Sequence, residues 1–412
     1  MDANHPEVPY VGVIPFVAIL LGIAVLPLLV PHFWEHNKNK GIFIALITLP
    51  TLAWLFSLDH HLIQHAALEY FSFICLLGSL YVVAGGIVLR GDLRSSPFAN
   101  AGVLAGGAVL ASLVGTTGAS MLLIRPFLRA NRIRSVTRHL PIFFIFIVSN
   151  AGGLLTPLGD PPLFLGFLRG VPFTWTLHLW PEWLLVNGAL IGLFFLIDYR
   201  ATQAAGAQPE LEKKPVSLAG VHNLIFLAMV VASAALLPFG WREAGMITAL
   251  LLSTFTTKKE LRAENGFTYH PIAEVAILFA GIFVTMQPAL QILMHHGPEM
   301  GLSTPRQFFW ASGLLSSFLD NAPTYLTFFT VAQSLGGPDL VANTGVAFDT
   351  LTAISLGSVL MGANTYIGNG PNFMVKAICD EAGFKTPSFI GYLAWSGGIL
   401  LPLWALLSFL VL

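Results

Sequence analysis

Two aspartates lie inside otherwise apolar stretches of the sequence, where a carboxylate could bind a cation or carry a proton. Asp160 falls within residues 149–162, and Asp320 falls within residues 316–323. A charge at the centre of a bilayer costs about 2.5–3.5 kcal/mol on an insertion scale, and carboxylate oxygens are ligands for hard cations. Each aspartate could also cap the helix that follows it. We expect a Na⁺ or proton site at Asp160 and Asp320, with capping as a second role.

Amide and hydroxyl side chains accompany the aspartates in the same interruptions. Their oxygens are neutral ligands for a cation, although each could instead bond to its own backbone. Besides the two aspartates, the predicted binding residues are Asn150, Thr156, Asn321, Asn364, Thr365, Asn369 and Thr117. Thr116 and Asn372 lie beside them in the same breaks.

The segments that carry these residues are apolar stretches broken by Gly, Pro and polar residues. They span residues 98–128, 141–168, 308–335 and 347–379. A broken helix exposes N–H groups that favour anions and carbonyl groups that favour cations. Within a membrane, such backbone is tolerated only where protein or a wet cavity surrounds it. We therefore expect the four breaks to meet near the midplane.

The composition predicts an all-α polytopic membrane protein. Of the 412 residues, 55% are hydrophobic and 10% are charged, against roughly 25% charged in soluble domains. The net charge of −1 and the lack of a basic patch predict no nucleic-acid partner. No Lys or Arg precedes the first apolar run, so we expect that run to be a retained span. Cys75 and Cys379 lie in apolar segments and are expected to pack there.

The two halves of the chain resemble each other at a constant offset of 209 residues. Residues 149–164 and 358–373 match in type at seven of sixteen positions, including Asp160 against Asn369. Such internal similarity is typical of transporters built from repeats. We expect a first repeat over residues 1–197, a linker over 198–218 and a second repeat over 219–412. Glu69 and Glu274 are expected to start corresponding helices, because acidic residues favour helix starts.

The distribution of basic residues predicts the topology. If residues 98–128 and 308–335 are re-entrant hairpins and the other two broken segments cross, both termini lie outside. Only Arg169, Arg242 and Arg306 of the 20 Lys and Arg residues then fall outside, as the positive-inside rule requires. The same threading makes the two repeats inverted. It predicts a multi-pass protein of the cell (inner) membrane.

The motif around Ser149-Asn150-Ala151-Gly152-Gly153 and Thr156–Asp160 resembles that of NhaD-type sodium/proton antiporters of the ion-transporter superfamily. Leu319-Asp320-Asn321-Ala322-Pro323 resembles their second-hairpin motif. The superfamily also includes arsenite, citrate and dicarboxylate transporters. The last break, residues 362–372, is more similar to organic-anion members, whereas the hairpin tips lack the Ser-Asn-Thr of dicarboxylate carriers. The resemblance implies a homodimer with a fixed scaffold and a transport unit that moves like an elevator.

These features predict an ion-coupled secondary transporter that exchanges Na⁺ for H⁺ by alternating access. The alternative is Na⁺- or H⁺-coupled transport of citrate or another small carboxylate. The expected partners are a small inorganic cation or small organic anion, membrane lipid and a second copy of the chain, with no cofactor beyond the transported ions. An intramembrane enzyme or a structural subunit is a third class. An enzyme is disfavoured because no nucleophile or phosphate-binding motif appears and no His falls in a break.

Overall fold

The computed structural model describes residues 8–91, 93–205 and 215–412. The structure is 77% helical. In the described part, seven helices are long and apolar enough to cross a membrane, and their spans are Tyr10–Pro27, Asn37–Leu58, His60–Ala84, Pro97–Val114, Trp175–Ala204, His270–Met300 and Phe389–Val411. The protein is therefore a helical, multi-pass membrane protein, as the composition predicts. Both cysteines are free and buried.

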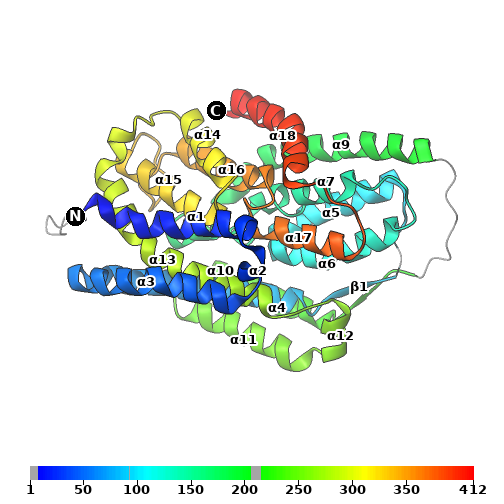
Figure 1. Cartoon of the computed structure of the whole chain (residues 1–412), viewed down its shortest axis with the longest axis horizontal. Helices are drawn as coiled ribbons and strands as arrows, with labels where there is room; N and C mark the ends of the chain where they lie inside the picture. The colour runs from blue at the N-terminus through cyan, green and yellow to red at the C-terminus, as the bar shows by residue number, and fades with distance from the viewer. Residues whose placement is uncertain (1–7, 92, 206–214) are drawn as a thin grey trace.

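One group of helices packs mainly on itself, and we call it the six-helix layer. It consists of α1 (Ile14–Leu29), α3 (Asn37–Leu58), α4 (His60–Ala84), α10 (His222–Leu236), α11 (Trp241–Thr256) and α13 (His270–His296). The short helices α2 (Pro31–Trp34) and α12 (Lys259–Glu264) join its members. In Figure 1 most of this layer lies along the lower part of the molecule.

The second group contains the interrupted segments, and we call it the broken-helix layer. Its first part is α5 (Pro97–Val114), α6 (Thr116–Asn131), α7 (His139–Ile147), α8 (Pro161–Leu168) and α9 (Trp180–Ala205). Its second part is α14 (Pro305–Ser316), α15 (Asn321–Leu335), α16 (Phe348–Leu360), α17 (Gly370–Glu381) and α18 (Phe389–Val411). Figure 1 places these helices above α3, α4 and α11. The breaks between helices contain the 3-10 turns η2 (Ala151–Leu155) and η5 (Met361–Asn364).

A small sheet is the exception to the all-helical prediction. Strand β1 (Val88–Arg90) pairs antiparallel with β2 (Ser217–Ala219), and Leu89 lies opposite Leu218. The strands lie at the right-hand end of Figure 1 beside α12. We call this the strand end of the molecule, and the other the opposite end.

The predicted linker differs from the structure at its start. Helix α9 continues to Ala205, so residues 198–205 are helical, and residues 206–214 lie outside the described residues. Asp198 is buried and pairs with Arg134 (2.7 Å) and His139 (2.8 Å). A buried ion pair with this many partners fixes the end of a helix, which is why the polar composition of this segment did not mark a loop.

The expected helix starts at the two glutamates are only half right. Glu274 lies in the first turns of α13, but Glu69 is the tenth residue of α4. Helix α4 begins earlier because the side chain of Asp59 caps it by accepting a hydrogen bond from the backbone N–H of His61 (2.8 Å). Glu69 is therefore placed in the middle of a helix and needs another explanation.

Candidate functional site

The buried side chain of Asp160 accepts hydrogen bonds from the other three interrupted segments. It is 1% exposed, and its Oδ1 accepts hydrogen bonds from Thr116 Oγ1 (3.0 Å) and Asn369 Nδ2 (3.3 Å). Its Oδ2 accepts from Asn321 Nδ2 (2.5 Å). All three donors are neutral, and no Lys, Arg or His pairs with Asp160 in the described part of the chain. The carboxylate is thus satisfied by hydrogen bonds but not compensated in charge.

The donors reach Asp160 because each stands at the start of a half-helix. Thr116 opens α6, Asn321 opens α15 and Asn369 is the N-cap of α17. The turn before Thr116 is formed by Gly115 at φ 82°, a conformation that glycine adopts readily. The backbone N–H of Thr116 donates to Gly159 O (2.9 Å). This bond ties the tip of the α5–α6 pair directly to the break that carries Asp160.

Each break is folded around a pair of glycines whose backbones touch. A Cβ on Gly159 would lie 2.1 Å from Gly153 O, and a Cβ on Gly368 would lie 2.6 Å from Gly362 O. No side chain fits at such distances. The glycines that match at the 209-residue offset therefore allow the same close approach of backbone in both breaks.

The two threonines predicted as ligands hold these breaks instead. Thr156 Oγ1 donates to Ser112 O (2.5 Å), and Thr365 Oγ1 donates to Ser317 O (2.5 Å). Each hydroxyl thus fastens a break to the end of the neighbouring helix, α5 in one half and α14 in the other. Their hydroxyl protons are engaged by backbone, so both threonines contribute to the frame of the site; whether they also bind an ion stays a prediction.

An amide network connects the two breaks to each other. Asn150 Nδ2 donates to Asn372 Oδ1 (2.7 Å), and Asn369 Nδ2 lies 3.2 Å from Asn150 Oδ1. Asn372 Nδ2 donates to Thr365 O (2.9 Å). Asn150 is therefore separated from Asp160 by Asn369. The sequence places Asn372 in the last break, but only the geometry shows that it joins the breaks.

Asn364, another predicted ligand, faces away from Asp160. Its Oδ1 accepts from Trp404 Nε1 (2.9 Å) on α18, and its Nδ2 donates to Ser317 Oγ (2.9 Å). The amide is used to hold the break against the outermost helix.

Asp320 caps its own helix and also lines a cavity. Its Oδ1 accepts from the backbone N–H of Ala322 (3.1 Å) at the start of α15. Thr117, the remaining predicted residue, lines the same cavity from the tip of α5–α6. The position of Asp320 is thus compatible with both predicted roles, capping of α15 and binding of an ion in the cavity.

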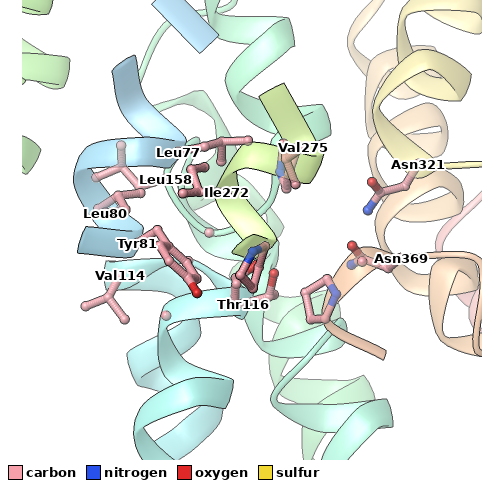
Figure 2. Close-up of a pocket in the computed structure, with 18 of the residues that line it drawn as sticks. Leu77, Leu80, Tyr81, Val114, Thr116, Leu158, Ile272, Val275, Asn321 and Asn369 are labelled. Carbon is pink, nitrogen blue, oxygen red and sulfur yellow. The ribbon is translucent and has the colours of Figure 1, made fainter. Parts of the chain in front are cut away.

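The cavity lies between the two layers and contains about 710 Å³ of empty space, including open solvent. From the broken-helix layer it is lined by residues that include Thr116, Asn321 and Asn369, which Figure 2 shows across from Leu77, Leu80 and Tyr81 of α4. Helix α13 adds Ile272, Val275 and Phe279. The α4 and α13 walls are ordinary apolar helix faces, so no sequence signal marked them.

The amide of Asn321 has an unused acceptor at this site. Its Nδ2 bonds to Asp160, while its buried Oδ1 has no hydrogen-bond partner among the described residues. Buried polar atoms are normally paired. A carboxylate and an unpaired amide oxygen side by side are the donor set that a hard cation prefers.

A protein-family model described as "Putative citrate transport" matches residues 5–412. The chain belongs to this family. No curated protein matches it. The citrate-transport family assignment, with the apolar helices, identifies a membrane transport protein and supports the resemblance to the citrate group of the superfamily. The resemblance to NhaD-type antiporters rests on the sequence motifs alone.

Proposed function

We propose that the protein exchanges Na⁺ for H⁺ and that both ions bind at Asp160. The observation that carries this proposal is a buried carboxylate with three neutral hydrogen-bond donors and no cationic partner in the described part of the chain. An ionised carboxylate that is buried without a counter-charge is costly, so it binds a cation or takes up a proton. Because one carboxylate cannot do both, binding of either ion displaces the other, and that competition is sufficient for antiport.

The remaining predicted ligands have separate roles in this proposal. Asn321 Oδ1 and the cavity-lining Asp320 and Thr117 complete the coordination of Na⁺. Asn369 orients the carboxylate, and Asn150 holds Asn369. Thr156, Thr365 and Asn364 maintain the shape of the breaks. The ions are cargo, so no resident cofactor is needed.

We further propose that the two halves are inverted repeats in which α5–α6 and α14–α15 are re-entrant hairpins. Support comes from two aromatic side chains 209 residues apart that each donate to the backbone of the break in their own half. Trp183 and Tyr392, on α9 and α18, donate to Gly152 O (3.1 Å) and Ala363 O (2.8 Å) in the two breaks. Alternating access would move the broken-helix layer against the six-helix layer, with both termini outside and a homodimer, as the resemblance implies.

The test is Na⁺-driven proton movement in proteoliposomes that contain a pH-sensitive dye. The wild-type protein should acidify or alkalinise the lumen according to the Na⁺ gradient, and Asp160→Asn should abolish the signal. Asp349→Asn is the matched control, because Asp349 is exposed at the start of α16. Exchange that persists in Asp160→Asn combined with Asp320→Asn would refute the mechanism.

A second candidate is cation-coupled transport of citrate or another small carboxylate, which the family match favours. The cavity is lined by first-turn residues of five helices, including Thr117 of α6, Pro161 of α8 and Gly370 of α17, and helix N-termini favour anions. Against it, the described residues that line the cavity include no Lys or Arg. Uptake of labelled citrate, measured beside the dye assay on the same vesicles, separates the two. Uptake driven by Na⁺ or H⁺ without citrate-independent proton movement would replace the antiport proposal.

A further inference from the structure

An ion pair joins the two layers away from the cavity. Arg169, at the end of α8, places Nε 2.6 Å from Glu69 Oε1 and donates from Nη2 to Oε2 (3.1 Å). The side chain of Glu69 is 9% exposed and that of Arg169 is 21% exposed. The Nη2 contact is a charge-assisted hydrogen bond, which is stronger than a neutral one, and the Nε contact is an ion pair without hydrogen-bond geometry. The pair explains why Glu69 stands in the middle of α4.

A second contact reinforces the attachment of α8 to the six-helix layer. The guanidinium of Arg242 lies 5.3 Å from the centre of the Phe167 ring. Arg242 is itself held by Glu243, 2.8 Å away on α11, and Glu243 accepts from Ser72 Oγ on α4 (2.6 Å). The end of α8 thus meets a cation that two helices of the other layer keep in place.

These contacts lie on one side of the cavity. The nearest cavity residue on α4 is Leu77, about 12 Å further along the helix at 1.5 Å per residue. The stretch between them holds Phe73, which packs on Phe279 (4.7 Å) and Phe283 (5.5 Å) of α13. The cavity walls instead extend toward the strand end, through Tyr81 and Pro271. The opposite end is therefore closed by aromatic packing and by the ion pair.

The corresponding glutamate in the second half serves as an internal reference. Glu274 pairs with Lys40 (2.6 Å), which links α13 to α3 within the six-helix layer. The same residue type at a related position therefore joins helices of one layer in one half and crosses between layers in the other. Of these two ion pairs, the Glu69 pair is the one that crosses between the layers and would have to break if the layers separate at that end.

We propose that the Arg169–Glu69 pair is a latch that keeps the cavity shut toward the opposite end and opens when the cavity turns to that side. The inference deepens the proposed transport function, since it assumes that access alternates. In this structure the Arg169–Glu69 pair is formed, and the α4 residues that line the cavity lie on the strand-end side of that pair. Neutralising both partners should release the latch without leaving one buried charge unpaired.

Sided thiol labelling of a cavity residue tests the latch. Leu77→Cys is introduced into a background with Cys75→Ala and Cys379→Ala, and a membrane-impermeant maleimide is added from the Arg169 side of oriented vesicles. Glu69→Gln with Arg169→Gln should raise the labelling rate about tenfold, on the scale of a lost charge-assisted contact. The exchanged pair, Glu69→Arg with Arg169→Glu, should return the rate toward that of the parent. Glu274→Gln with Lys40→Gln is the matched control, because it likewise neutralises both partners of a pair with a buried member, and it should change the rate less than about twofold.

An unchanged labelling rate in the neutralised Glu69–Arg169 pair, or an equal rise in Glu274→Gln with Lys40→Gln, overturns the latch. Failure of the exchanged pair to lower the rate while it folds normally by size-exclusion chromatography also overturns it. The labelling needs no assumption about the cargo. If the variants show these labelling changes but the wild-type protein shows no Na⁺-driven proton movement, the latch proposal stands and the antiport proposal is refuted.

Discussion

The two breaks share one backbone design but carry different chemistry at the matching position. In both, a glycine pair lets the backbone cross itself and a threonine ties the break to the adjacent helix. The first break then presents Asp160, and the second presents Asn369. The carboxylate receives hydrogen bonds, whereas the amide gives them to Ser149 O (3.2 Å) and to Asp160. A duplicated frame can thus place an acceptor in one half and its donor in the other.

The largest effect on ion exchange is expected when a carboxylate is placed at the matching position of the second break. In Asn369→Asp, two carboxylates would lie near 3.3 Å apart, and the new one would face acceptor oxygens of Ser149 and Asn150. Ion exchange should fall about 100-fold. Because the donors at Asp160 do not surround position 369, Asp160→Asn/Asn369→Asp should stay at least about tenfold below wild type. Recovery of the double variant in the dye assay would show that the two positions are equivalent.

The two glycine pairs should differ in how much stability is lost when a glycine is replaced by alanine. A Cβ on Gly153 would lie 2.9 Å from Gly159 O and 2.7 Å from Thr116 Cγ2, whereas a Cβ on Gly362 has its nearest atoms at 3.2 Å. We expect Gly153→Ala to lower the free energy of unfolding by about 2 kcal/mol and Gly362→Ala by less. Denaturant titration in detergent micelles measures both. Equal losses would mean that the second break is packed as tightly as the first.

The two aspartates should also differ in how much each contributes to Na⁺ exchange. An asparagine at position 320 keeps an oxygen that accepts from the N–H of Ala322, and asparagine caps helices as well as aspartate does. Asp320→Asn should therefore lower Na⁺ exchange only about tenfold, by removing one nearby charge, and leave the unfolding midpoint unchanged. Proteoliposome exchange and thermal unfolding of the same sample check both statements. Inactivation as complete as that of Asp160→Asn would assign the two carboxylates equal roles.

The smallest effect is expected where the breaks agree. Thr156→Val removes the bond to Ser112 O and the one accepted from Leu158 N–H. Thr365→Val removes the bond to Ser317 O and those accepted from the N–H groups of Ile367 and Gly368. Each substitution should cost about 1 kcal/mol of stability, with similar values for both and little change in the apparent Na⁺ affinity. A loss of affinity in either variant would return that threonine to the ion-binding set.

The location of the breaks could be predicted from sequence, but the division of labour within them could not. Gly and Pro in apolar stretches mark where a helix must stop, and the 209-residue offset aligns Asp160 with Asn369. Whether a threonine or asparagine in a break points inward depends on which backbone carbonyl lies beside it. Asn364, which bonds to Trp404 forty residues away, illustrates this. Contacts between layers, such as Arg169 with Glu69, leave no local pattern at all.

The β1–β2 ribbon has a consequence for how the layers can move. The chain leaves the six-helix layer after β1, builds α5–α9 and returns at β2, and the two strands lie side by side. Arg90 anchors β1 to α12 through Glu264 (2.7 Å), and this hydrogen bond lowers the pKa of the Glu264 carboxyl. The β1–β2 pairing therefore holds the two ends of the chain segment that contains α5–α9 side by side. Any movement of this module against the six-helix layer would therefore have to keep this point in place.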